Sequence, residues 1–397
     1  MVGSTRGWLG FLTVVSLVAG CAGLFRSAPL LPTYAKVLTL GPRIEWRFNP
    51  LALDLNRDGH LDLVATARLV KPALHMWVGD GKRTFTSIAA TWTDIGYAAL
   101  ASGDINGDGF PDIVAASHFG VVQTLLSDGR GGFTEKTLRR EDGYVAAELA
   151  DLNGDGHLDL ILLGYRTAGL EVYLGDGTGN WKLHTTLPEP RPERTMPGRA
   201  LVVGHLNHDG HLGVVAAFQR SIYIYYGDGR GGFTGGPVDF YSPTRQFQSL
   251  ALGDVNKDGH PDIVINGTFS GRDQPNGPDV YLGNGRGEWK ASSAGLKVLK
   301  LVSASVGVAL GDLDGDGNLD IVAGGNVTGD VRNGYGLFWF RGDGKGGWRL
   351  VQESGLPSKG LPVIHSVTLA DLDGDGTLEI IALSGGPNGS ITIWKRQ

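Results

Sequence analysis

A nine-residue pattern of oxygen-bearing side chains recurs in this chain, and its spacing suits a divalent cation. In the first copy, oxygen-bearing side chains stand at positions 1, 3, 5 and 9, namely Asp54, Asn56, Asp58 and Asp62, with a glycine at position 6. Calcium is a hard cation that takes six to eight oxygens, and side chains alternating along a sharply turned loop can converge on one ion. The backbone carbonyl at position 7, from His60, adds a further ligand.

Near copies of this loop follow down the chain, and we number them one to seven in chain order. Three or four carboxylates within nine residues repel one another, which favours a bound counter-ion over simple turn formation, the alternative for such aspartates. We therefore expect six structural calcium ions, in every loop but the fourth. The expected ligands are Asp54, Asn56, Asp58, His60 and Asp62; Asp104, Asn106, Asp108, Phe110 and Asp112; Asp151, Asn153, Asp155, His157 and Asp159; Asp254, Asn256, Asp258, His260 and Asp262; Asp312, Asp314, Asp316, Asn318 and Asp320; and Asp371, Asp373, Asp375, Thr377 and Glu379.

These loops are not EF-hands, because an EF-hand needs a glutamate at position 12 and two flanking helices. Position 12 of loop one is Ala65, inside a β-rich run. The ions are expected to be structural, since a catalytic metal keeps an open coordination position.

Loop four departs from the pattern, with His205 in place of the first aspartate and Gly213 in place of the last. We predict no calcium there. A transition-metal site of His205, His208 and His211 is the alternative, since imidazole suits zinc or copper. Histidine also stands at position 7 of other loops, however, which favours a degenerate loop over a new metal site.

The elements that position these loops are short strands. Successive loops start 47 to 59 residues apart, and each of the first six is followed by an Asp-Gly or Asn-Gly motif between apolar runs. That dipeptide is a strong hairpin signal, and four antiparallel strands in a period of about 50 residues are typical of a propeller blade. The sequence predicts an all-β, seven-bladed propeller. Its last repeat is cut short, so we expect the strand at residues 33–40 to complete the seventh blade and close the ring.

The pairing of D-x-N/D-x-D-G-x-x-D with a downstream G-D-G-x-G-x-F/W resembles FG-GAP (VCBS-type) repeats over about residues 33–397. These repeats build the β-propeller of integrin alpha subunits and of many bacterial surface proteins. The resemblance implies the same propeller, calcium loops on β-hairpins, and ligand binding on the face opposite those loops.

The first 32 residues have a separate character. Residues 1–20 carry an early arginine, an apolar run and a small-residue end, which is typical of a signal peptide. The stretch LVAGC resembles a bacterial lipobox, so we expect lipidation at Cys21, the single cysteine of the chain, with residues 21–32 as a linker. A plain signal peptide or an uncleaved membrane anchor is the alternative. We expect a lipid-anchored protein of the bacterial cell envelope, at its periplasmic or extracellular face, with the outer membrane favoured.

Function is expected on the face opposite the acidic loops, where the connections vary. Loops on a rigid scaffold commonly carry binding. The candidate ligand residues there are Tyr97, His118, Tyr144, Arg166, Arg199, Phe247 and His365. The net charge of −6 argues against a nucleic-acid partner. We expect a binding or scaffold module for a protein partner or a surface glycan. A carbohydrate-active hydrolase or lyase that uses the central channel is the alternative, although no catalytic motif is present.

Overall fold

The computed structural model describes residues 31–397 except 69, 90–91, 94, 141, 166–168, 188–197, 235–239, 243–244, 270–276, 300–306 and 327–330. The chain divides into two compact units, Met1–Leu31 and Pro32–Gln397, and the described residues belong almost wholly to the second. The expected signal peptide, Cys21, most of the linker and Arg166 lie outside the described residues. Within the described part, no helix combines the length and apolarity needed to span a membrane.

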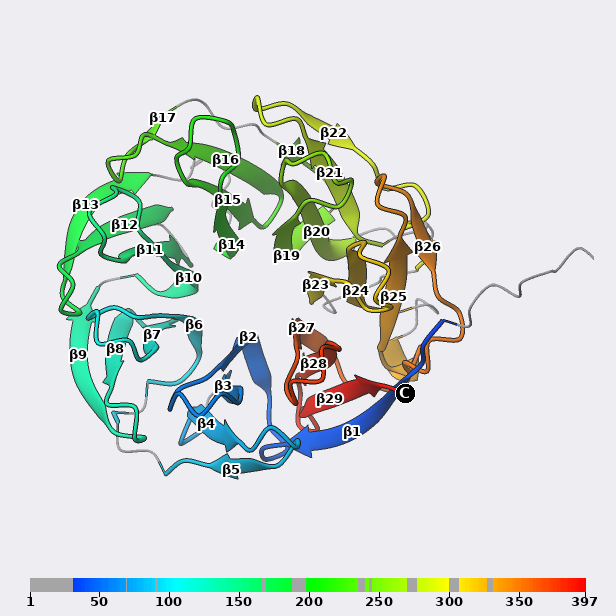
Figure 1. Cartoon of the computed structure of the whole chain (residues 1–397), viewed down its shortest axis with the longest axis horizontal. Helices are drawn as coiled ribbons and strands as arrows, with labels where there is room; N and C mark the ends of the chain where they lie inside the picture. The colour runs from blue at the N-terminus through cyan, green and yellow to red at the C-terminus, as the bar shows by residue number, and fades with distance from the viewer. Residues whose placement is uncertain are drawn as a thin grey trace, which may run out of the picture. The chain divides into compact units, whose positions relative to one another are not determined.

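The second unit consists of seven antiparallel sheets arranged as the blades of a ring, which confirms the predicted seven-bladed propeller (Figure 1). The innermost strands are β2 (Trp46–Leu53), β6 (Ala98–Gly103), β10 (Tyr144–Ala150), β14 (Gly198–Gly204), β19 (Arg245–Gly253), β23 (Val308–Gly311) and β27 (Ile364–Ala370). The second strands are β3 (Asp62–Ala67), β7 (Asp112–Ser117), β11 (Asp159–Gly164), β15 (Gly213–Phe218), β20 (Asp262–Phe269), β24 (Asp320–Gly325) and β28 (Glu379–Ser384).

The third strands are β4 (Leu74–Gly79), β8 (Val121–Ser127), β12 (Leu170–Gly175), β16 (Ser221–Gly227), β21 (Asp279–Gly283), β25 (Gly336–Gly342) and β29 (Ile391–Arg396). The outer strands are β5 (Phe85–Ser87), β9 (Phe133–Arg139), β13 (Trp181–Leu187), β17 (Phe233–Thr234), β22 (Trp289–Ala291), β26 (Trp348–Leu350) and β1 (Tyr34–Leu40). Two elements stand outside this scheme: β18 (Phe240–Tyr241), which pairs with β16 as a fifth strand of blade four, and the short 3-10 helix η2 (Val331–Asn333).

The ring closes where the first strand of the chain completes the last blade. β1 pairs antiparallel with β29, from Tyr34 opposite Arg396 to Leu40 opposite Ile391, as predicted for residues 33–40. The two strands lie side by side at opposite ends of the colour scale in Figure 1. This pairing leaves β29 without a free edge, whose unpaired amides and carbonyls would otherwise recruit other chains.

The core lies between adjacent blades. The second strands β3, β7, β11, β15, β24 and β28 are buried along their whole length, as expected for strands covered on both faces. One cluster joins Leu163 of blade three to Phe218 and Tyr223 of blade four. The outer strand β13 is largely exposed. The acidic loops connect each innermost strand to the second strand, so they share one face of the ring, and the starts of the innermost strands lie on the other.

Candidate functional site

The described structure forms two distinct regions that bear on function: the acidic loops on one face and a cavity at the centre of the other. In loop one, the carboxylate of Asp54 accepts hydrogen bonds from the amides of Asp58, at 3.1 Å, and Gly59, at 2.8 Å. The carboxylate of Asp58 accepts one from the amide of His60 at 2.9 Å. The loop therefore curls around its own position 1 and 5 carboxylates, with Gly59 at a φ of 85°, a conformation that favours glycine.

The position 9 carboxylate is fully buried and serves the fold directly. Asp62 Oδ2 accepts a hydrogen bond from the Leu55 amide and Oδ1 accepts one from the Gly79 amide, both at 2.8 Å. Burial raises the pKa of Asp62 to about 6, with the charges of Asp58 and Asp54 acting in the same direction. The equivalent aspartates of loops two, three, five and six make the same pair of contacts with their own blades. The acid at position 9 therefore stabilises the fold through these two hydrogen bonds, whether or not an ion is bound.

Loops one, two, three and five fit a calcium ion by the chemistry of their donors. Each offers carboxylate oxygens at positions 1, 5 and 9 and an amide oxygen at position 3, the hard ligands that calcium prefers. Within the described residues, no cationic side chain forms an ion pair with these carboxylates. Bound calcium would offset the repulsion among them.

Loops six and seven fit calcium less well, because a side-chain cation of the same blade reaches their carboxylates. Arg341, on β25, pairs with Asp314 and Asp316 of loop six. Lys395, on β29, contacts the carboxylates at positions 3, 5 and 9 of loop seven. Each of these loops also brings three carboxylate oxygens within 4.8 Å of one another. The calcium expected in these two loops remains a prediction, and the structure provides a competitor for it.

Loop four retains the turn without the buried acid. Asp209 still accepts a hydrogen bond from the His211 amide at 2.8 Å. The His208 ring packs edge-on against His260 of the neighbouring loop, with ring centroids 4.5 Å apart. Among the described residues, the groups of three or more potential metal ligands consist of carboxylates from loops six and seven and include no histidine of loop four.

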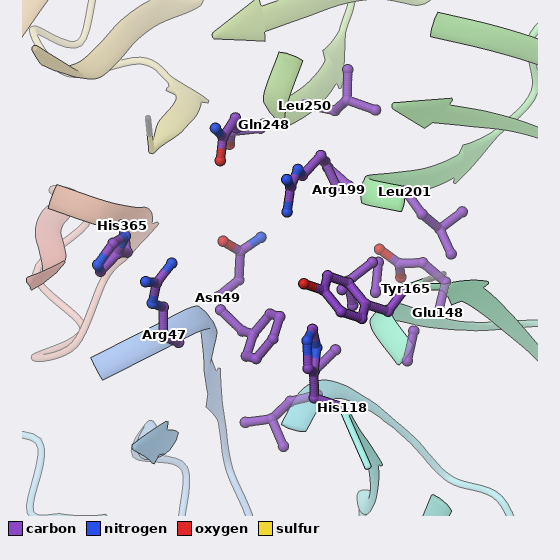
Figure 2. Close-up of a pocket in the computed structure, with 18 of the residues that line it drawn as sticks. Arg47, Asn49, His118, Glu148, Tyr165, Arg199, Leu201, Gln248, Leu250 and His365 are labelled. Atoms are coloured by element: carbon purple, nitrogen blue, oxygen red, sulfur yellow. The ribbon is translucent and has the colours of Figure 1, made fainter. Parts of the chain in front are cut away.

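The second region is a cavity of about 320 Å³ at the starts of the innermost strands (Figure 2). Arg47 and Asn49 enter it from β2 and Arg199 enters from β14, and Figure 2 shows Asn49 and Arg199 extending toward the middle of the space. An aromatic row forms one wall. Tyr97 lies with its ring centroid 4.7 Å from that of His118, whose ring in turn lies 3.7 Å from Tyr165.

The cavity carries more positive than negative side-chain charge. Arg199 forms no ion pair with any described residue, and its Nε is buried without a hydrogen-bond partner. Burial lowers the pKa of Arg199. Arg47 pairs with Glu45 at 2.7 Å. Burial raises the pKa of Glu148 to about 7, and burial together with the charge of Arg47 lowers the pKa of His365 to about 4.

The structure brings four of the seven candidate ligand residues to this cavity: Tyr97, His118, Arg199 and His365. Two others lie in the interior. The Tyr144 hydroxyl donates a hydrogen bond to Glu171 at 2.7 Å, and Phe247 is 2% exposed within a hydrophobic cluster. Arg166 is outside the described residues.

Sequence reasoning missed several lining residues, among them Arg47, Asn49, Glu148 and Gln248. They lie on innermost strands rather than in the variable connections where we sought a site. The only available signal was the interruption of apolar strands by charged or amide residues, which is weak on its own.

Comparison with known proteins agrees with this architecture. The model of the FG-GAP-like repeat matches residues 54–115, 104–162, 151–216, 205–265, 268–323 and 327–382, and that of the FG-GAP repeat matches residues 247–286. No curated protein matches the chain.

Solved structures share the fold at low identity. A lectin of Agrocybe aegerita with specific recognition of non-reducing terminal N-acetylglucosamine is 18% identical, covering 80% of this chain and 84% of its own, with a TM-score of 0.52. BBS1N in complex with ARL6DN, from crystals soaked with lead, is 12% identical, covering 93% and 98%, with a TM-score of 0.54. Likenesses at this identity support the fold alone. The repeat matches span well over half of the sequence, and the chain belongs to the family of FG-GAP repeat proteins.

Proposed function

We propose that this propeller is a binding module for an acidic glycan, which it takes into the central cavity opposite the acidic loops. The observation that carries the proposal is Arg199, a half-buried cation without an ion pair among the described residues, whose Nε is buried on the wall of a cavity of about 320 Å³. A guanidinium presents a planar fork of donors that matches a carboxylate, and a carboxylate ligand would supply the missing charge.

The aromatic row beside Arg199 supports a sugar rather than a bare anion. The rings of Tyr97, His118 and Tyr165 present apolar faces with polar edges. A sugar ring can pack its C–H face on such a surface while its hydroxyls reach hydrogen-bonding groups. Asn49 and Gln248 line the same cavity and offer both donors and acceptors.

Binding is favoured over glycoside hydrolysis by the number of carboxylates. Most glycosidases use two carboxyl groups on either side of the scissile bond. Among the described residues that line the cavity, Glu148 is the only one with a carboxylate. The similar solved structures do not favour one class of partner, since the Agrocybe aegerita lectin recognises a sugar and BBS1N is in complex with ARL6DN. The proposal of a glycan is therefore supported by the cavity rather than by either likeness.

The proposal includes two further parts. Calcium stabilises the propeller through loops one, two, three and five, whose residues would hold it at positions 1, 3, 5, 7 and 9. A lipid on Cys21 anchors the module in the cell envelope, which rests on the sequence pattern of residues 17–21. Replacing Cys21 by serine should move the protein from the membrane fraction to the soluble fraction, and continued membrane retention would contradict the lipid anchor.

The binding proposal is tested by calorimetric titration with glycans that carry carboxylates and with the same glycans after carboxyl reduction. The wild type should bind the acidic form, and Arg199→Met should weaken binding at least about tenfold, the loss expected for a charge-assisted hydrogen bond of roughly 1.5–3 kcal/mol. Arg349→Met, at an exposed arginine of β26, is the control and should bind as the wild type does. Equal binding of the acidic and reduced forms, or binding only of a protein partner, would overturn the proposal.

A further inference from the structure

We propose that the Lys395 ammonium takes the place of a metal ion in loop seven, so that the blade that closes the ring is ordered without calcium. Lys395 Nζ lies 2.8 and 2.7 Å from the two carboxylate oxygens of Asp373, 2.7 Å from Asp375 Oδ2 and 2.9 Å from Glu379 Oε1. These acids stand at positions 3, 5 and 9, which are three of the four positions whose side-chain oxygens are proposed to bind calcium in the other loops.

The ammonium is held as a bound cation would be held. The Lys395 side chain is only 11% exposed, and an ammonium has three donors, which here meet three carboxylates. In the other five loops with an acid at position 9, the backbone amide of the third strand contacts that acid, as Gly342 contacts Asp320 at 2.8 Å. In loop seven, Lys395 Nζ meets that acid, Glu379, in addition to the Leu372 amide.

Strand register shows that Lys395 occupies a defined place in the repeat. Within each blade, the second residue of the second strand pairs with a residue of the third strand. The next residue along the third strand defines an equivalent place in each blade. Trp394 pairs with Ile380, which puts Lys395 at this place in blade seven, and Phe340 pairs with Ile321, which puts Arg341 there in blade six. In the remaining blades this place holds Val78, Leu126, Leu174, Tyr226 and Leu282.

The cation at this place accompanies a change at position 3 of the loop. Blades one to five have asparagine at position 3 and an uncharged residue on the third strand. Blades six and seven have aspartate at position 3, Asp314 and Asp373, and a cation on the third strand. The fourth carboxylate and its cation therefore occur together. A calcium ion in loop seven would have to displace the ammonium from carboxylates it already neutralises, or share them with it against mutual repulsion.

This inference uses the proposed calcium binding of loops one, two, three and five only as a comparison for loop seven. The experiment distinguishes failure of the inference from failure of the calcium proposal. In the full-length protein, hydrogen exchange followed by mass spectrometry is measured with calcium and with chelator for peptides covering each loop. Chelation should accelerate exchange in loops one, two, three and five and leave residues 371–379 unchanged. Acceleration in loop seven as well would overturn the inference, whereas no change in any loop would contradict only the calcium proposal.

A pair of variants tests the substitution directly. Asp373→Asn with Lys395→Leu gives loop seven and its blade the residues found in blade three, and this double variant should bind one more calcium ion per chain than the wild type in native mass spectrometry. Lys395→Leu alone should lose protection of residues 371–379 in chelator and regain it in calcium. The control Lys182→Leu, at an exposed lysine of β13, should change neither measurement. A double variant with the calcium count of the wild type would overturn the inference.

Discussion

The amide of Gly79 donates a hydrogen bond to Asp62 Oδ1 at 2.8 Å, and this contact ties the two repeated motifs of blade one to each other. Asp62 ends the acidic loop, and Gly79 begins the Gly-Asp-Gly hairpin. The other oxygen of the same carboxylate receives the Leu55 amide. The acidic loop and the hairpin therefore form one folded unit, in which the position 9 carboxylate accepts backbone amides in addition to the oxygen that it offers, with positions 1, 3 and 5, to the proposed ion.

This division of labour predicts different effects for two aspartates of loop one. Asp62→Ala leaves two buried amides without an acceptor and should lower the free energy of unfolding by roughly 2–5 kcal/mol, and most of this loss should persist in chelator. Asp54→Ala should cost more in calcium than in chelator, because Asp54 is partly exposed and is proposed to bind the ion. Urea unfolding of both variants in each buffer makes the comparison. An Asp62 variant that is destabilised only in calcium would contradict the structural role of position 9.

Removal of calcium should lower the melting temperature of the wild type by several degrees. An ion that binds only the folded state at a hundredfold excess over its Kd stabilises that state by about 2.7 kcal/mol per site. Calorimetric scans with chelator, and with chelator followed by excess calcium, measure the loss and its recovery. Magnesium is the matched control and should restore less, since it demands near-octahedral geometry. A melting temperature unchanged by exhaustive chelation would contradict calcium stabilisation.

The seven blades and the ring closure could be predicted because local sequence patterns that recur in every repeat determine both. Each loop and hairpin lies within one repeat, and residues 33–40 supplied the strand that the truncated last repeat lacked. The direction of single side chains on the opposite face was less predictable. Tyr144 and Tyr97 each lie near the start of an innermost strand, yet Tyr144 turns inward because its hydroxyl finds Glu171, which the sequence places 27 residues away.

The cations of blades six and seven were missed for a related reason. Arg341 precedes Gly342 and Asp343 in a hairpin motif, and this local setting indicates only a turn. Its contact with Asp314 spans 27 residues and becomes visible only when the strand register is known. A signal was nevertheless present, since the residue before the hairpin glycine is apolar or aromatic in blades three to five and arginine in blade six.

Two glycines of blade one, Gly59 in the acidic loop and Gly81 in the hairpin, predict a steric effect that can be separated from backbone strain. Gly81 has a φ of 64°, and a Cβ there would lie 2.2 Å from Nδ1 of His60. Gly59 has a φ of 85° but open space around its Cβ position. Gly59→Ala should therefore cost about 1–2 kcal/mol from the left-handed backbone alone. Gly81→Ala should cost about 1 kcal/mol more, because the exposed His60 ring has to leave its preferred rotamer, as measured by urea unfolding.

A double variant checks the origin of that difference. Because the clash involves the His60 ring, His60→Ala combined with Gly81→Ala should recover the extra loss and leave only the backbone cost. A double variant as unstable as the sum of its two single variants would show that His60 packing is not what excludes a side chain at Gly81.

Binding of an acidic ligand in the cavity should strengthen as the pH falls through about 7. Burial raises the pKa of Glu148 to about 7, so this carboxyl becomes neutral below that pH and ceases to repel an anion. The pKa of His365 is about 4, so this group stays neutral throughout the window. Titrations of the acidic glycan between pH 5.5 and 8.5 measure the dependence. The control is Glu148→Gln, which should lose the part of the pH dependence that is due to Glu148. His118 also lines the cavity, but it is present in both proteins and so does not affect their difference.

The same carboxyl also links pH to stability, with a sign that follows from its raised pKa. In the unfolded chain Glu148 ionises near its ordinary value of about 4.3, whereas in the folded protein it holds its proton until about pH 7. The unfolded state therefore binds fewer protons between these values, and the contribution of Glu148 to the free energy of unfolding falls as the pH rises through the window. Glu148→Gln should flatten this part of the profile in urea unfolding between pH 4.5 and 8. A variant with the same slope as the wild type would show that Glu148 titrates normally and would remove the basis for the pH-dependent binding.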